Sequence, residues 1–315
     1  MLRRFGKENC ATWVQARCMP DQIITASAPD AGFAIIAGIT TELVRETQER
    51  HQLSPTASAA VGRLVTGAAL LGTNLKGSER ISLQIQGDGP IAGITADAWL
   101  LTPDSVGARG YAKNGDVDIP LNNRGKFDVA RAIGKGALQV TKSYEVGQPY
   151  AGVVPLYSGE IAEDIASYLV NSEQIPSVVA LGVLANPEGI VAAGGVIAQV
   201  LPGAHEQAVA GLEQRALAMP PVTTLISKGA TAHDLLHALA GDAQLRAHRT
   251  LDIRFACRCT REKVEAALLG LGVDQLRISA RERAETEATC EFCKKVYVFS
   301  SEEIDGLAAR IEKAG

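Results

Sequence analysis

Four of the six cysteines of this 315-residue chain lie within its last 65 residues, in the strings FACRCT and TCEFCKK. Cys257 and Cys259 have one residue between them, and thirty residues later Cys290 and Cys293 have two residues between them. Four thiolates suit the tetrahedral coordination of zinc, and C-x₂-C is a usual spacing of zinc ligands, whereas C-x-C is tighter. The pattern predicts one zinc site per chain.

Zinc binding would decide whether this part of the chain folds. Bringing the two cysteine pairs together closes a loop of thirty residues, and a loop of this length costs on the order of 3 kcal/mol in entropy. Structural zinc contributes roughly 10–16 kcal/mol in finger-sized peptides at neutral pH. We therefore expect the tail to fold with its metal and to loosen without it.

The spacing alone leaves a permanently structural site and a redox-sensitive site both open. The C-x-C pair favours the second, because a disulfide needs Cα atoms about 4.4–6.8 Å apart. Residues two apart on an extended strand lie at or beyond that limit, so a disulfide between Cys257 and Cys259 would be strained and easily reduced again. Zinc also keeps thiols deprotonated, which is the form that reacts with oxidants. Oxidation would thus remove the ligands and release the metal.

The composition indicates the class of protein. Hydrophobic residues make up 46% of the chain and charged residues 21%, which is typical of a globular protein and not of a disordered one. The net charge of −4 gives no electrostatic reason to expect nucleic acid or an anionic membrane as a partner. The first residues lack an apolar run of signal-peptide length. The low-charge stretch 54–77 contains Arg63 and predicts a buried helix, not a membrane span. We expect a cytoplasmic protein.

Charge density and helix signals divide the chain into three predicted parts. Residues 1–202 mix strand and helix patterns and predict an N-terminal α+β domain. Residues 203–256 contain short alanine-rich helices, one of them stopped by Pro220-Pro221. Helices this short are marginal in isolation, so we predict a metastable helical linker. Charged residues number 23 of the last 65 but 43 of the first 250, which marks residues 257–315 as a separate small zinc-binding domain.

Local signals predict individual elements. The segment ISLQIQGDGPIAGITADAW alternates apolar residues around a Gly-Asp-Gly turn and predicts a β-hairpin. Ser54, Ser158, Thr231, Thr260 and Ser300 each predict a helix N-terminus. The segment ATCEFCKKVYVF predicts a strand-like run with the second cysteine pair at a turn. Two apolar stripes are expected in the tail: Val264, Ala267, Leu268 and Leu271 after Thr260, and Ile304, Leu307, Ala308 and Ile311 after Ser300.

The sequence resembles the heat-shock protein 33 family of redox-regulated chaperones over nearly its whole length. The resemblance rests on the C-x-C and C-x₂-C frame, on TREKV after the first pair and on CEFCKKVYVF at the second. It rests equally on upstream segments: HQLSPTASAAVGRLVTGAALLGTNLK, IQGDGPIAGITADA, ARGY, GKGALQVTK, YSGEIAEDIASYLVNSEQIPSVVALGV and AGGVIAQVLPGA. The segment ISARERAETEATC departs from the family pattern, because it is more charged and poorer in glycine.

The resemblance implies an ATP-independent chaperone (a holdase) that is not an enzyme and that binds unfolding client proteins. It implies one zinc ion held by Cys257, Cys259, Cys290 and Cys293 in the reduced, inactive state. It further implies that oxidation joins Cys257 to Cys259 and Cys290 to Cys293. The zinc domain and then the linker unfold, and the active form is a homodimer. Residues 203–256 fall where the family has its linker.

Other functions have less support. A zinc-ribbon protein that binds nucleic acid or a translation factor should have a basic face, but the last 65 residues hold 11 basic and 12 acidic residues. A thiol oxidoreductase would place C-x₂-C at a helix N-terminus within a βαβ unit, whereas here the pair lies in a strand-like run.

Two further sets of residues are chemically interesting. His233 and His237 in HDLLH share one helical face, as zinc-binding histidines do. A metallohydrolase would need a third ligand and a pocket, so we expect satisfied or solvated side chains. Cys10 and Cys18 lie outside the four-cysteine frame, and we expect them to be ordinary thiols.

Overall fold

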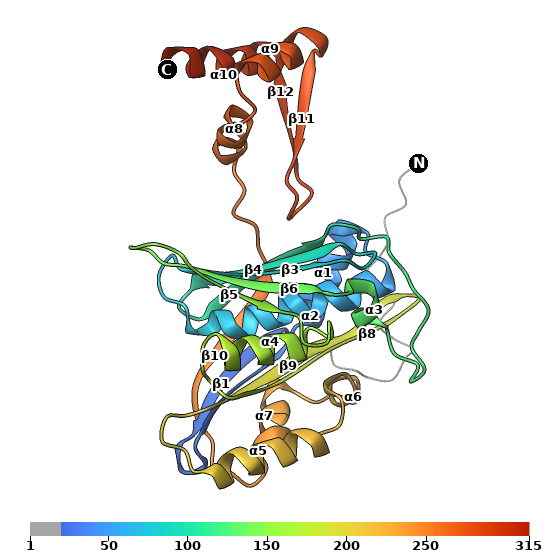
Figure 1. Ribbon diagram of the computed structural model, residues 1–315, viewed down its shortest axis with the longest axis vertical. Helices are drawn as coiled ribbons and strands as arrows, with labels where there is room; N and C mark the ends of the chain where they lie inside the picture. The colour runs from blue at the N-terminus through green and yellow to red at the C-terminus, as the bar shows by residue number, and fades with distance from the viewer. Residues whose placement is uncertain (1–19, 315) are drawn as a thin grey trace. The chain divides into compact units, whose positions relative to one another are not determined.

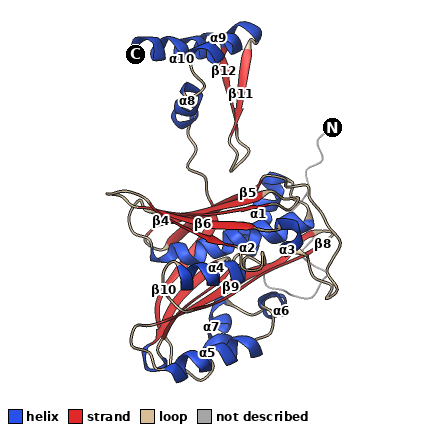
Figure 2. Cartoon of the chain, in the orientation of Figure 1, coloured by secondary structure: helices blue, strands red, loops and turns tan. Residues whose placement is uncertain are grey.

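The structure, a computed structural model, describes residues 20–314. The chain divides into two compact units, the first ending at Phe255 and the second comprising residues 256–315 (Figure 1). Both units contain helices and strands, so the predicted α+β class is confirmed (Figure 2). Each unit also has a hydrophobic core of its own.

The first unit is built on one ten-stranded sheet with the order β7-β6-β3-β4-β5-β10-β1-β2-β9-β8. Its strands are β1 (Gln22–Ala28), β2 (Phe33–Ile39), β3 (Arg80–Gly87), β4 (Gly93–Thr102), β5 (Ser105–Ala112), β6 (Gly136–Ser143), β7 (Tyr150–Pro155), β8 (Ser177–Asn186), β9 (Gly189–Val200) and β10 (Arg246–Phe255). Neighbouring strands are antiparallel except β5 and β10, which run parallel. The predicted hairpin is confirmed as β3 and β4, in which Ile81, Leu83 and Ile85 face the core.

The helix α2 (Pro55–Leu71) forms the centre of the larger core. It begins as predicted, because the Ser54 side chain accepts a hydrogen bond from the Ala57 N–H and Pro55 occupies the first turn. It contacts β4 and β5 in one half of the sheet and β8 and β9 in the other, so the sheet curves around it (Figure 1). All but three of its 17 residues are buried, which confirms the predicted buried helix. No helix among residues 20–314 is long and apolar enough to cross a membrane.

Short helical elements complete this layer: α1 (Thr41–His51), α3 (Val129–Ile133), α4 (Ala162–Asn171) and the 3₁₀ turns Pro29–Ala31 and Gly72–Asn74. The prediction that Ser158 caps α4 is wrong. The buried carboxylate of Asp164 instead accepts hydrogen bonds from four backbone N–H groups of the preceding loop, including those of Gly159 and Ile161. A carboxylate has enough lone pairs to order the whole loop, whereas a hydroxyl does not.

Residues 203–255 belong to the first unit. Their helices α5 (Glu206–Ala218), α6 (Val222–Ser227) and α7 (Ala232–Ala240) cover the sheet face opposite α2, and β10 follows them into the middle of the sheet. On β2, Phe33 and Ile35 face these helices while Ile36 faces the α2 core, as the two-residue period of a strand requires. The predicted start of α7 at Thr231 is confirmed, and the metastability of residues 203–256 stays a prediction.

The second unit consists of α8 (Arg261–Leu269), α9 (Val273–Glu282), β11 (Glu285–Thr289), β12 (Val296–Ser300) and α10 (Ser301–Ala314). Thr260 caps α8 as predicted, and Ser300 and Glu303 form the predicted capping box of α10. Among its described residues the buried core consists of Leu276, Tyr297, Phe299, Ile304, Leu307 and Ala308 besides Cys293. The stripe predicted for α8 is wrong at Ala267 and Leu271, which are exposed. Leu271 lies beyond the helix, which ends at Leu269 in a glycine-containing turn, whereas Ala267 lies on the solvent-facing side of the helix.

Candidate metal centre

The second unit brings the four predicted cysteines together. The four Sγ atoms lie within 4.8 Å of one another and could hold a metal ion. Cys257 Sγ lies 3.8 Å from Cys290 Sγ, and Cys259 Sγ lies 3.4 Å from Cys293 Sγ. Tetrahedral zinc with Zn–S bonds of about 2.3 Å separates its sulfur ligands by about 3.8 Å. The donor set and its spacing therefore fit a zinc ion.

The second pair of cysteines is positioned by the turn between β11 and β12. The Cys290 N–H donates to the Lys295 carbonyl at 2.9 Å, and the Lys294 N–H donates to the Cys290 carbonyl at 2.8 Å. Lys294 adopts a left-handed backbone conformation with φ of 59°, which tightens the turn. Backbone N–H groups of Phe292 and Cys293 point at the Cys290 sulfur. The knuckle thus donates hydrogen bonds to a sulfur ligand, which stabilises its anionic form.

The first pair lies on the segment between β10 and α8. Thr260 follows directly after Cys259, and its hydroxyl accepts the Lys263 N–H at 3.3 Å, so the start of α8 fixes the end of the C-x-C segment. Lys263 also donates from its Nζ to the Arg258 carbonyl at 2.8 Å, between the two cysteines. A helix start and a hairpin turn therefore hold the two halves of the site.

The thiols differ in their tendency to ionise. Burial opposes ionisation of Cys259, but hydrogen bonds from Tyr297 and the other three thiols outweigh it and lower its pKa to about 7. Burial raises the pKa of Cys290 and of Cys293. The protein alone thus favours one thiolate in the cluster. Four adjacent thiolates require a cation among them.

Tyr297 is a site residue that the sequence did not predict. Its hydroxyl donates to Cys259 Sγ at 3.2 Å, and its side chain is 6% exposed. It faces inward on β12 together with Phe299, two residues further along, and the Arg261 guanidinium lies 4.1 Å from the Phe299 ring. The alternation of VYVF would have placed Tyr297, four residues after Cys293, in the core, but only the fold places its hydroxyl beside Cys259.

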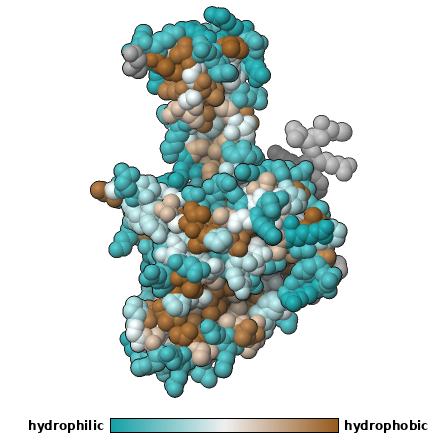
Figure 3. Space-filling model, viewed as in Figure 1, coloured by the Kyte–Doolittle hydropathy of each residue, from teal (hydrophilic) through white to brown (hydrophobic). Residues whose placement is uncertain are grey.

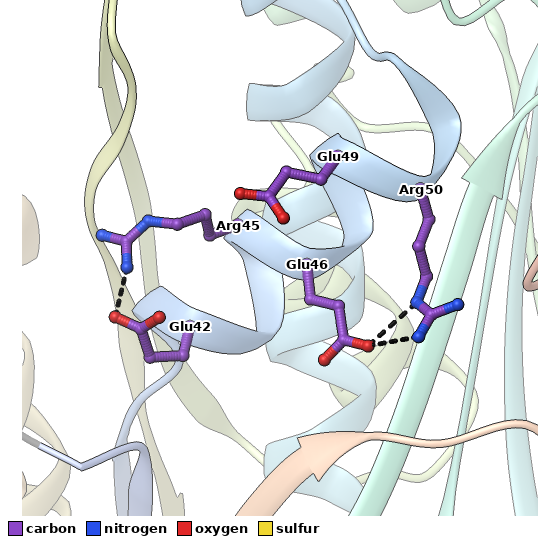
Figure 4. Close-up of a pocket in the computed structure, with 5 residues that line it drawn as sticks. All are labelled: Glu42, Arg45, Glu46, Glu49 and Arg50. Carbon is purple, nitrogen blue, oxygen red and sulfur yellow. Dashed lines mark hydrogen bonds and ion pairs between the residues drawn. The ribbon is translucent and has the colours of Figure 1, made fainter. Parts of the chain in front are cut away.

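The remaining candidates do not contribute to this site. His233 and His237 lie on α7 in the first unit, and Cys10 and Cys18 lie outside the described residues. A shallow surface pocket on α1 is lined by Glu42, Arg45, Glu46, Glu49 and Arg50 (Figure 4). Its arginines pair with glutamates of the same helix, so we assign no ligand to it.

Comparison with known proteins identifies the family. The family model described as Hsp33 protein matches residues 21–300. The chain belongs to the Hsp33 family. The 33 kDa chaperonin of Acetivibrio thermocellus is 41% identical over 296 residues, which are 93% of this chain and 99% of that protein. That of Bacillus subtilis is 40% identical over 290 residues, or 91% and 98% of the two chains.

A solved structure supports the same assignment. The crystal structure of a 33 kDa chaperonin (heat shock protein 33 homologue) from Thermotoga maritima has a TM-score of 0.85 and 36% sequence identity. The match covers 94% of this chain and all of that chain. The Hsp33 family is a chaperone family, which supports a chaperone function with unfolded client proteins as partners and points away from an enzyme.

Proposed function

We propose that this chain is a redox-regulated, ATP-independent holdase of the cytoplasm that is inactive with zinc bound and active when oxidised. The observation that carries the proposal is the four-sulfur cluster, with all Sγ atoms within 4.8 Å, in a unit that has few other buried residues. In the reduced state Cys257, Cys259, Cys290 and Cys293 bind one zinc ion per chain. Bound zinc would neutralise four thiolates at once and link the C-x-C segment to the β11–β12 turn.

Loss of the sulfur ligands would then unfold the second unit. A small core rarely stabilises about 60 residues without a disulfide or a metal. An oxidant such as a peroxide takes two electrons for each disulfide formed, so two equivalents convert all four thiols. The ligands are lost and the metal leaves, and the main contribution to folding of residues 256–315 is removed.

The pairing of the disulfides decides whether oxidation lets the two halves of the site separate. Links from Cys257 to Cys290 and from Cys259 to Cys293 would join the closest sulfurs of the folded site but would keep its two halves tied together. Links from Cys257 to Cys259 and from Cys290 to Cys293 leave the halves free to separate. Neighbours in sequence also stay close after unfolding, whereas the cross-links must close a loop of about thirty residues. We therefore propose the neighbouring pairs.

The linker, residues 203–256, supplies the link to client binding. Its three helices cover an apolar sheet face that includes Phe33, Ile35 and Val196. While they are in place, the visible surface of the first unit is mostly hydrophilic with separate apolar patches (Figure 3). Release of these helices would join buried apolar residues into one larger exposed area, which is the kind of surface that binds unfolded chains or a second copy. We propose that the active form is a homodimer.

A nucleic-acid function has no support in the charge arrangement of the second unit. Arg261 pairs with Glu303 at 2.7 Å, and Arg277 pairs with Asp305 and Glu312. Paired arginines at the surface leave little net positive potential for a phosphate backbone. We propose no nucleic-acid partner and no membrane partner.

The test measures zinc stoichiometry and chaperone activity on the same samples. The reduced chain should hold one zinc and should fail to prevent aggregation of a heated client protein, as followed by light scattering. After peroxide at elevated temperature, zinc should be released in proportion to the suppression of aggregation, without ATP. Peptide mapping by mass spectrometry should find the two neighbouring disulfides. Full chaperone activity in the reduced, zinc-loaded chain would contradict the proposal.

A further inference from the structure

The helix α7 carries two histidines that the chaperone cycle does not use. His233 and His237 are four residues apart, which places them on one face of the helix. Their ring centroids are 4.5 Å apart, with the planes tilted by 52°. Both side chains are exposed, whereas the opposite face of α7 is buried through Leu235, Leu236 and Leu239. Among the described residues, neither ring takes part in a hydrogen bond.

The charges around the pair favour a cation. Asp234 lies between the two histidines in sequence and accepts hydrogen bonds from the Thr231 N–H at 2.8 Å and the Thr231 hydroxyl at 2.7 Å. These bonds lower the pKa of Asp234, and the two histidines add to the effect, so its negative charge acts on both rings. Arg215 donates from its Nε to the Leu239 carbonyl, in the last turn of α7 and away from the first histidine.

We propose that His233 and His237 chelate a divalent transition-metal ion such as Ni²⁺ or Zn²⁺, with water completing its coordination. Neutral imidazole nitrogen is the common protein ligand of these ions. Two histidines at positions i and i+4 are the arrangement by which a helix supplies two ligands to one metal. This site has two protein ligands and is exposed to solvent, so its affinity for the metal is far below the affinity of the four-cysteine site for zinc.

The site has a consequence for regulation, which rests on the proposed function. Both ligands face the same ion only while α7 is helical, so the metal binds the folded linker and not the unfolded one. At a free metal concentration ten times the Kd, such binding raises the ratio of folded to unfolded linker about 11-fold. A metal on α7 therefore opposes release of the linker and restrains activation of the chaperone.

The binding test uses the untagged, reduced, zinc-loaded full-length chain and Ni²⁺ as the probe. Calorimetric titration should show one Ni²⁺ bound per chain, and the zinc content should stay constant. His233→Ala and His237→Ala should each weaken nickel binding at least about 10-fold, in line with loss of a metal-centre contact. His205→Ala is the matched control, because His205 precedes α5 and its side chain makes no capping bond. Equal nickel binding by the parent and His233→Ala would overturn the proposal.

The regulatory step has its own measurement. With Ni²⁺ at ten times the parent's Kd, amide exchange of α7 in the reduced parent should slow about 11-fold, and exchange in His233→Ala should slow by about twofold at most. Nickel binding without slower exchange would overturn the restraint on the linker. If peroxide fails to unfold residues 203–256 in the parent, the proposed function fails, whereas the nickel titration of the reduced chain still decides the metal site.

Discussion

The two units of this chain differ in the size of their apolar cores. In the first, α2 is enclosed by strands from both halves of a ten-stranded sheet and lies in a large apolar core, whose burial favours folding. In the second, α8–α10 and a single hairpin bury few side chains, and four sulfurs from two distant segments meet at one point. On the proposed function, the four cysteines lie in the unit with the smaller apolar core because there the loss of a metal would become loss of structure.

The largest expected effect comes from removing one ligand of each cysteine pair. In Cys257→Ser/Cys290→Ser half of the sulfur ligands are lost, and with them about half of the roughly 10–16 kcal/mol that structural zinc contributes. Zinc should no longer bind at micromolar concentration, and peroxide should no longer change the chaperone activity. Competition with a chromophoric chelator measures the first effect and light scattering of a heated client the second.

The control for this variant is Cys10→Ser/Cys18→Ser, which leaves the four-cysteine frame intact. It should bind zinc and respond to peroxide like the parent. A Cys257→Ser/Cys290→Ser protein that still responds to peroxide would show that other thiols act as the sensor.

Truncation of one core side chain in each unit should have different effects on zinc affinity. Phe299 and Leu64 are both fully buried, Phe299 in the second unit and Leu64 on α2. Phe299→Ala should cost about 3–5 kcal/mol, and because folding and metal binding are expected to be coupled there, zinc affinity should fall by about 10²–10⁴-fold. Leu64→Ala should lower the free energy of unfolding of the first unit by about 2–5 kcal/mol and leave zinc affinity unchanged. Equal zinc affinities in the two variants would remove the distinction between the units.

A smaller effect is expected from the hydroxyl beside the metal centre. Tyr297→Phe deletes the hydrogen bond to Cys259 Sγ and keeps the ring, which lies 4.8 Å from the Lys295 ammonium. Partners of metal ligands typically contribute 10–100-fold in affinity, and for one bond to one of four sulfurs we expect about 10-fold. Competition with a chelator at constant pH measures this change in zinc affinity. An unchanged affinity would mean that Tyr297 serves only in packing.

The smallest expected effects come from two helix caps. Thr231→Ala removes the cap of α7 and Thr260→Ala that of α8, each at a cost of about 1 kcal/mol. The first should speed amide exchange of α7 about fivefold without changing zinc affinity. The second should lower zinc affinity about fivefold without changing exchange in α7. Crossed effects, in which either variant changes the other quantity, would show that the two regions are not energetically separate in the reduced state.

Much of the fold could be predicted because it follows from local signals. The cap at Ser54, the alternation in β3 and β4 and the capping box at Ser300 are properties of a few adjacent residues, and all three are confirmed. The start of α4 was not predictable from Ser158, because Asp164, further along, orders that loop. The order of the sheet is likewise set by tertiary contacts, and nothing near β10 indicates its parallel pairing with β5.

In the candidate metal centre, too, some residues could be predicted from local sequence and others depend on the tertiary structure. The clustering of its four cysteines could be predicted because metal coordination restricts both residue type and spacing. Tyr297 could not, since a tyrosine in an apolar strand is usually a core residue, and its hydrogen bond to Cys259 depends on where α8 begins. The helix α9 was missed because its charged sequence contains a single buried residue, Leu276. The disulfide pairing stays a prediction from the family resemblance.

The central claim, that a metal ion holds the second unit and not the first, is tested most directly by amide exchange of the fully reduced chain with and without zinc. On removal of zinc by a chelator, residues 256–315 should lose their protection, while α2 and the strands around it should exchange at unchanged rates. If the reduced, zinc-free chain protects its second unit as well as the zinc-loaded chain does, the metal does not determine that structure and the account is contradicted.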